Sequence, residues 1–183
     1  ESVIWRSMLC LVLLALPMIV PAGSTQPPAT SAVDSAEFAR LKTLTGTWLL
    51  VDDAGKPTTN VGSVFEVVAM GHSIRETMFP GTPEEMVNMY YRNGPATEMV
   101  HYCASGNQPR LNIRATEPDA LSLEFIDATN LDSPDAEHMR SAKYLWEGSD
   151  RLRTEWQSWK DGKPSGTTVF NLIRQQAAAD SGR

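Results

Sequence analysis

The stretch Met86–Leu111, MVNMYYRNGPATEMVHYCASGNQPRL, decides the fold that the sequence predicts. Apolar and polar residues alternate on both sides of Asn93-Gly94, the dipeptide most typical of a tight β-hairpin turn. A second turn over Ser105–Pro109 is rich in residues that tolerate turn geometry. The pattern therefore predicts three successive antiparallel strands, over residues 86–92, 97–104 and 110–116.

The same alternation extends to both sides of this stretch. It predicts seven further strands, over residues 46–52, 61–70, 72–79, 120–127, 141–147, 151–160 and 166–174. A helical pattern over Ala36–Leu44 precedes them. Ten short strands at regular spacing, with no βαβ alternation, indicate an all-β meander. Closing the sheet removes its edges, so we predict an antiparallel up-and-down β-barrel of about ten strands with a short N-terminal helix. A β-sandwich is the alternative.

The N-terminal region predicts export. Residues 1–22 have a basic residue, Arg6, and an apolar run that ends in Val-Pro-Ala, as in a cleaved signal peptide. The run is short for a membrane span, although a transmembrane anchor is the alternative. We therefore expect a signal peptide over 1–22, a flexible linker over 23–35, a barrel domain over 36–175 and a disordered tail over 176–183. The mature protein would be periplasmic or secreted, without a stable membrane span.

The net charge argues against a nucleic-acid partner, and the cysteine content argues against an internal disulfide. The chain carries a net charge of −6, and no cluster of Lys and Arg suits nucleic acid. Of its two cysteines, Cys10 lies in the predicted leader, so Cys103 has no partner for an internal disulfide. A core of about 140 ordered residues is large enough to stabilise one domain without disulfides. We expect a monomer or a weak homodimer.

Two short stretches resemble the lipocalin-like (calycin) superfamily. Gly46-Thr47-Trp48, on the first strand after a short helix, resembles its Gly-x-Trp signature, and Arg174 ends the last strand. The resemblance implies that Trp48 packs across one end of the barrel against Arg174. An indole ring and a guanidinium stack favourably, which makes this pairing chemically reasonable.

Longer motifs resemble an exported bacterial family of lipocalin-like proteins whose function is unknown. They are the segments FPGTPEEMV over 79–87, HYCASGNQPR over 101–110 and DATNL over 127–131. The likeness covers residues 41–174. It implies a lipocalin-like barrel and an export route, and it implies no activity.

Strand alternation also selects candidate site residues. Glu76 shares a face with two apolar neighbours, which predicts that it points inward and needs a polar partner such as Arg110 or His101. That partner would make it either a ligand anchor or an internal ion pair. His101 and Cys103 are two residues apart, so both should point to one face. Arg110 is either a two-pronged ligand for a carboxylate or phosphate, or a surface residue.

These patterns favour a binding protein for a small apolar or amphipathic molecule. We predict that apolar side chains line its cavity, namely Met78, Met86, Phe125 and Trp156. Four polar groups would orient the ligand, namely Glu76, Tyr90, His101 and Arg110.

Other functions remain open at this stage. His101 could act as the general base of a cavity hydrolase or isomerase, or bind haem or a metal, and the barrel could instead be a filled structural protein. No catalytic, nucleotide-binding or metalloprotease motif is present, so we predict no cofactor, no metal and no nucleic-acid partner. The acidic segment over 128–140 predicts a long, solvated loop that could cover the mouth of a barrel.

Overall fold

The computed structural model describes residues 34–176. One helix, α1 (Ala36–Lys42), is followed by ten strands and a short 3-10 turn, η1 (Ala69–Gly71). The strands are β1 (Gly46–Val51), β2 (Pro57–Val68), β3 (Ser73–Met78), β4 (Met86–Asn93), β5 (Ala96–Tyr102), β6 (Gln108–Glu117), β7 (Ala120–Thr129), β8 (His138–Trp146), β9 (Arg151–Lys160) and β10 (Lys163–Arg174).

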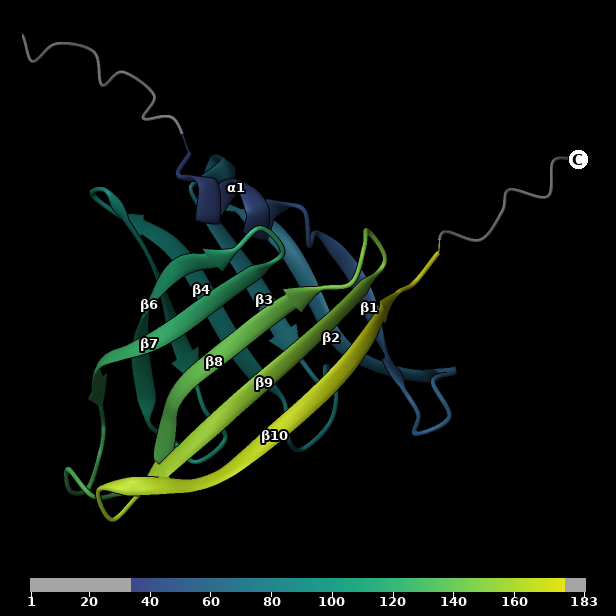
Figure 1. Cartoon of the computed structure of the whole chain (residues 1–183). Helices are drawn as coiled ribbons and strands as arrows, with labels where there is room; N and C mark the ends of the chain where they lie inside the picture. Colours follow the sequence, from purple (N-terminus) through teal and green to yellow (C-terminus); the bar gives the residue numbers. More distant parts are fainter. Residues whose placement is uncertain (1–33, 177–183) are drawn as a thin grey trace, which may run out of the picture. The chain divides into compact units, whose positions relative to one another are not determined.

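The strands form a closed antiparallel barrel (Figure 1). Each strand pairs with its neighbours in the chain, and β1 pairs with β10 through Trp48–Arg174 and two further residue pairs. The predicted up-and-down barrel is therefore confirmed, and the sandwich is excluded. Closure satisfies the backbone groups that an open sheet would leave at its two edges.

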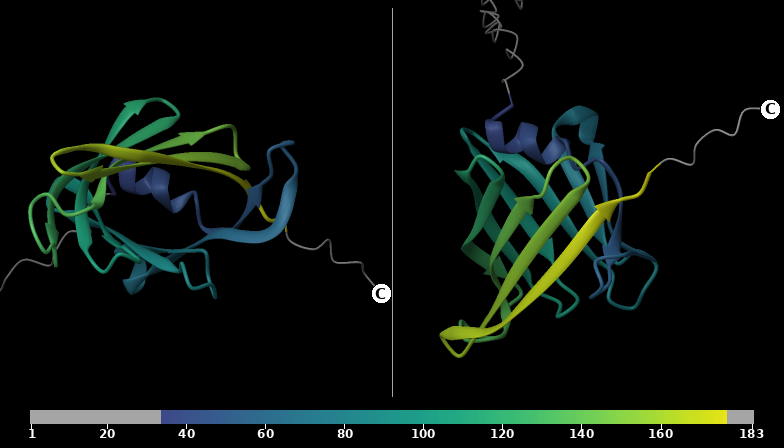
Figure 2. Two further views of the ribbon diagram at one scale, coloured as in Figure 1. Left: turned by 90° about the horizontal axis from the view of Figure 1, so that it is seen from below. Right: turned by 45° about the vertical axis from the view of Figure 1, so that its right-hand side comes forward.

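Helix α1 closes one end of the barrel. The Ser35 hydroxyl accepts a hydrogen bond from the Phe38 amide at 3.1 Å and so caps the first turn. Phe38, Leu41 and Leu44 recur at helical spacing and are fully buried. Figure 2 shows the helix lying across the barrel end opposite the viewer. One end of the barrel is thus filled by the helix.

Trp48 and Arg174 fasten β1 to β10 beside the helix. The Arg174 guanidinium lies 4.3 Å from the centre of the Trp48 ring, as the resemblance implies. Its Nη1 and Nη2 atoms donate to the carbonyls of Thr45 and Thr43, each at 2.7 Å. The Trp48 indole donates to the Leu44 carbonyl at 2.7 Å. Both side chains therefore bind backbone carbonyls of the segment that joins α1 to β1.

Several local boundaries differ from the sequence prediction, since β2 begins at Pro57 instead of residue 61 and β10 begins at Lys163 instead of residue 166. Strand β8 begins at His138, so the loop before it is shorter than the predicted 128–140 segment, because β7 continues to Thr129. The β2–β3 connection is the 3-10 turn η1, in which Met70 has a φ of 55°. The predicted signal peptide and nearly all of the linker and tail lie outside the described residues. Within residues 34–176, no helix is long and apolar enough to cross a membrane.

We expect Arg174→Ala to lower the free energy of unfolding by about 2 kcal/mol, because it removes a cation–π stack and two charge-assisted hydrogen bonds. Chemical denaturation monitored by circular dichroism measures this change. Arg151→Ala, an exposed arginine at the start of β9, is the matched control and should change stability by less than about 0.5 kcal/mol. Equal effects of the two substitutions would contradict the role assigned to Arg174.

Candidate functional site

A cavity of about 730 Å³ opens beside the β3–β4 connection. This connection lies at the end of the barrel away from α1 (Figure 1). Its walls come from the end of β1, the first half of β2, the β3–β4 connection, the start of β4 and the middle of β10. Six lining residues are apolar: Leu50, Val61, Phe79, Pro80, Met86 and Phe170. Four are polar: Thr59, Asn60, Thr82 and Glu84. We call this the mouth cavity.

Two aromatic rings give the mouth cavity a defined wall. Phe79 and Phe170 meet edge to face, with their ring centres 5.1 Å apart. Both rings, with Leu50 and Met86, pack against the buried core. The wall is therefore held by the core, while its open side remains accessible to a ligand.

The row of side chains next to Met86 separates the mouth cavity from deeper layers. Strand register aligns Ser63, Met78 and Met86 across β2, β3 and β4. Met78 is 3% exposed, and its sulfur lies 3.4 Å from the Asn88 amide nitrogen in the next row. Met86 is the only one of the eight predicted ligand residues that lines the mouth cavity.

The deeper row contains a buried carboxylate with four hydrogen-bond donors. Glu76 is 1% exposed. Its Oε1 accepts from the Ser63 hydroxyl at 2.6 Å. Its Oε2 accepts from the Asn88 amide at 2.7 Å and from the hydroxyls of Tyr90 and Tyr144 at 2.5 and 3.2 Å. The two tyrosine hydroxyls also lie 2.7 Å apart. The prediction that Glu76 points inward and has polar partners is confirmed.

Burial controls the ionisation of this cluster. Loss of water raises the pKa of the Glu76 carboxyl above its usual value, and the four hydrogen bonds partly oppose that shift. Burial beside Glu76 raises the pKa values of Tyr90 and Tyr144 well above their usual range. The tyrosines therefore remain proton donors, and Glu76 is the group whose charge can change.

Glu76 orients His101 through Asn88. The Asn88 amide nitrogen donates to Glu76, so its oxygen faces His101 Nδ1, 2.6 Å away. An amide oxygen only accepts, which assigns the proton of the ring to Nδ1. His101 Nε2 is buried and has no partner among residues 34–176. Burial also lowers the pKa of His101 to about 4.

His101 has the protonation state of a general base, but a substrate cannot reach it. Its Nε2 lone pair is free and its ring orientation is fixed, which are two requirements of proton abstraction. However, the side chain is 1% exposed and packs 5.3 Å from the Trp156 ring centre. A substrate would have to displace core residues to reach it.

Arg110 lies on the outside of the barrel, and the predicted Arg110–Glu76 pairing is wrong. Its guanidinium donates to both Asp127 carboxylate oxygens, at 3.0 and 2.6 Å, and to Glu98 at 3.3 Å. These hydrogen bonds lower the pKa of Asp127 and raise that of Arg110. His101 does not pair with Glu76 directly either, because Asn88 stands between them.

Phe125 and Cys103 also lie apart from the buried cluster. The Phe125 ring packs 4.9 Å from the ring of His138 and does not line the mouth cavity. Strand β5 ends at Tyr102, so the alternation that links His101 to Cys103 does not extend that far. Cys103 is a half-buried turn residue whose amide donates to the Asn107 carbonyl at 3.1 Å.

Several residues of these two regions were not among the predicted site residues. Asn88, Ser63 and Tyr144 complete the Glu76 cluster. Strand register is the signal that could have identified Asn88, because Asn88 is the cross-strand neighbour of both Glu76 and His101. In the mouth cavity, Leu50 comes from β1, Phe170 from β10 and Phe79 from the β3–β4 connection. Sequence alternation does not show that these segments meet.

Comparisons with known proteins add no family. No protein-family model matches the chain, and a search of curated proteins found no match. Among the described residues, no group of three or more His, Cys, Asp and Glu side chains is placed to hold a metal ion.

The raised pKa of Glu76 predicts a pH dependence of stability. The folded state binds the Glu76 proton more tightly than the unfolded state, so this group stabilises the fold at low pH. That contribution is lost as pH rises from about 4.5 through the raised pKa. In Glu76→Gln, the amide oxygen can accept from Asn88 and the tyrosines, and its NH₂ can donate to Ser63. We expect the variant to lack this part of the pH dependence.

Urea denaturation of the wild type and Glu76→Gln between pH 4 and pH 8 measures the difference. The free energy of unfolding of the variant should increase relative to that of the wild type as pH rises. A gap that is constant with pH would show that Glu76 does not titrate in this range.

His101 should remain neutral well below the usual histidine range. We expect ¹⁵N NMR to show a proton on Nδ1 and an unprotonated Nε2 at pH 5, with titration near a pKa of about 4. Because the pKa of His101 is lowered from 6.5 to about 4 in the folded state, the stability that this group contributes is lost as pH falls from 6.5 to about 4. Titration near 6.5, or a proton on Nε2, would contradict the assigned geometry.

Proposed function

We propose that this protein binds a small, largely apolar molecule in the mouth cavity of its barrel. The observation that carries the proposal is the cavity of about 730 Å³, whose apolar lining is rimmed by a few polar groups. Pockets that bind small molecules combine these two features, and their usual volumes include this value.

The chemistry of the lining favours an uncharged apolar body. Phe79, Phe170 and Met86 offer aromatic faces and a polarisable sulfur, which suit rings and alkyl chains. Thr59, Asn60 and Thr82 offer hydrogen-bonding groups for a polar end of the ligand. Glu84 is the charged residue of the lining, so a ligand anion would be repelled there.

The filled core favours binding over catalysis. Glu76, His101 and Trp156 are each at most 2% exposed, and Met78 covers Asn88 on the mouth side. The polar groups with unusual ionisation therefore lie behind the cavity wall. We infer that they hold the barrel together, while the mouth cavity holds the ligand.

Export and family membership complete the proposal. The apolar run within residues 1–22 supports cleavage of a signal peptide, and the motifs over 79–87, 101–110 and 127–131 support kinship with exported lipocalin-like proteins. We infer that the mature protein acts outside the cytoplasm, as a monomer or weak homodimer, and takes up its ligand there.

Binding of the neutral dye N-phenyl-1-naphthylamine tests the site. We expect its fluorescence to rise on addition of the protein, and we expect Phe170→Ser to weaken binding about tenfold, because a buried aromatic contact is lost. Val169→Ser is the matched control, since Val169 is the adjacent residue on β10, is 39% exposed and is not part of the cavity lining.

The dye experiment has two contradicting outcomes. Absence of dye binding by the wild type would remove the proposed function. Equal weakening by the two serine variants would place the dye outside the mouth cavity.

A further inference from the structure

A second hollow, of about 490 Å³, lies where β7 and β8 separate. The ladder between these strands ends at Glu124–Ser141, and residues 131–134 of the loop after β7 line the hollow. Phe125, Leu131 and Pro134 contribute apolar surface, and Ser133, His138 and Arg140 contribute polar groups. The hollow shares no lining residue with the mouth cavity.

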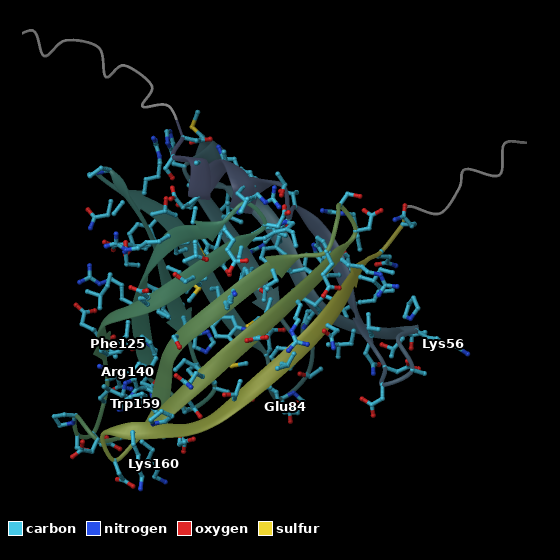
Figure 3. All side chains as sticks on the ribbon, in the orientation of Figure 1. Lys56, Glu84, Phe125, Arg140, Trp159 and Lys160 are labelled. Carbon is cyan, nitrogen blue, oxygen red and sulfur yellow. The ribbon has the colours of Figure 1, made fainter. Side chains whose placement is uncertain are left out.

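Arg140 is held in a fixed plane at this hollow. Its guanidinium carbon lies 4.7 Å from the Phe125 ring centre and 4.9 Å from that of Trp159. Figure 3 shows the three side chains together near the ends of β8 and β9. Stacking uses the faces of a guanidinium and leaves its N–H groups, which point outward in the plane, available for an acceptor.

The other stacked arginines show what Arg140 lacks. Arg40 stacks on Trp146 and donates to Asp119 at 2.8 Å. Arg174 stacks on Trp48 and donates to two carbonyls. The Arg140 guanidinium makes no hydrogen bond or ion pair with any residue of the described range 34–176. It is therefore a pre-oriented cation without a protein acceptor.

His138 supplies a second, independent polar position. It is 3% exposed, and its Nδ1 lies 2.7 Å from the Ala136 carbonyl, so Nδ1 carries a proton. Its Nε2 is buried and has no partner among the described residues. Buried polar atoms are normally hydrogen-bonded, and because His138 lines the hollow, a molecule bound there can supply the contact that this nitrogen lacks.

We propose that this hollow binds a small carboxylate with an apolar body. The carboxylate would lie in the plane of the Arg140 guanidinium and accept two parallel hydrogen bonds, the geometry that arginine favours. A hydroxyl or N–H group on the ligand body would donate to the Nε2 atom of His138. Phe125, Leu131 and Pro134 would contact the apolar body. Asp132 also lines the hollow, and its charge disfavours a multiply charged anion such as phosphate.

Isothermal titration with benzoate tests this site. We expect the wild type to bind benzoate, Arg140→Gln to bind at least tenfold more weakly, and Arg140→Lys to lie between them, because lysine keeps the charge without the planar fork. Arg153→Gln is the matched control, an arginine of β9 that pairs with Glu155 and should leave affinity unchanged. Phe170→Ser should also leave it unchanged, which separates this site from the mouth cavity.

Two further measurements keep the test decisive. Benzyl alcohol, which lacks the charge, should bind at least tenfold more weakly than benzoate. If Arg140→Gln does not fold, ¹⁵N NMR of the wild type should show that benzoate shifts the indole signal of Trp159 and not that of Trp48.

The proposal is overturned if the wild type does not bind benzoate at millimolar concentration. It is also overturned if benzyl alcohol binds equally well, or if a folded Arg140→Gln retains full affinity.

Discussion

The buried carboxylate of Glu76 is the constraint on which the interior of this barrel depends. An ionised or protonated carboxyl inside a protein requires partners, and here the donors come from β2, β4 and β8. Strands β2, β3 and β4 are neighbours, whereas β8 lies across the barrel. The Tyr144 hydroxyl therefore connects opposite walls. Because removing any one donor leaves a buried polar group, the cluster fixes strand register as well as stability.

This cluster divides the barrel into two functional halves. On the side of α1, buried apolar residues and the Trp48–Arg174 contact fill the interior. On the other side, Met86 lines an open cavity, and the buried Met78 is its cross-strand neighbour on β3. The barrel interior is therefore filled on the side of α1 and open on the side of the mouth cavity. The proposed ligand binding and the stability of the fold thus depend on different residues.

The sequence predicted the fold well because its strands are local. Alternation and turn residues such as Asn93-Gly94 identify successive hairpins, and a meander needs no other information. The inward direction of Glu76 followed from the same alternation. The site was harder to predict because its contacts join distant strands. Arg110 follows a turn and pairs across β6 and β7 with Asp127, which alternation cannot reveal. Phe79 and Phe170, far apart in sequence, meet only when β10 closes against β1.

The location of a bound apolar ligand tests most directly the claim that the barrel is filled behind Glu76 and open in front of it. The measurement is a set of intermolecular NOEs between N-phenyl-1-naphthylamine and assigned side chains of the wild-type protein. We expect contacts from the dye to Phe79, Phe170 and the Met86 methyl group, and none to Tyr90 or Trp156. Contacts to Trp156 or to the His101 ring would show that the ligand enters the core and would contradict the account.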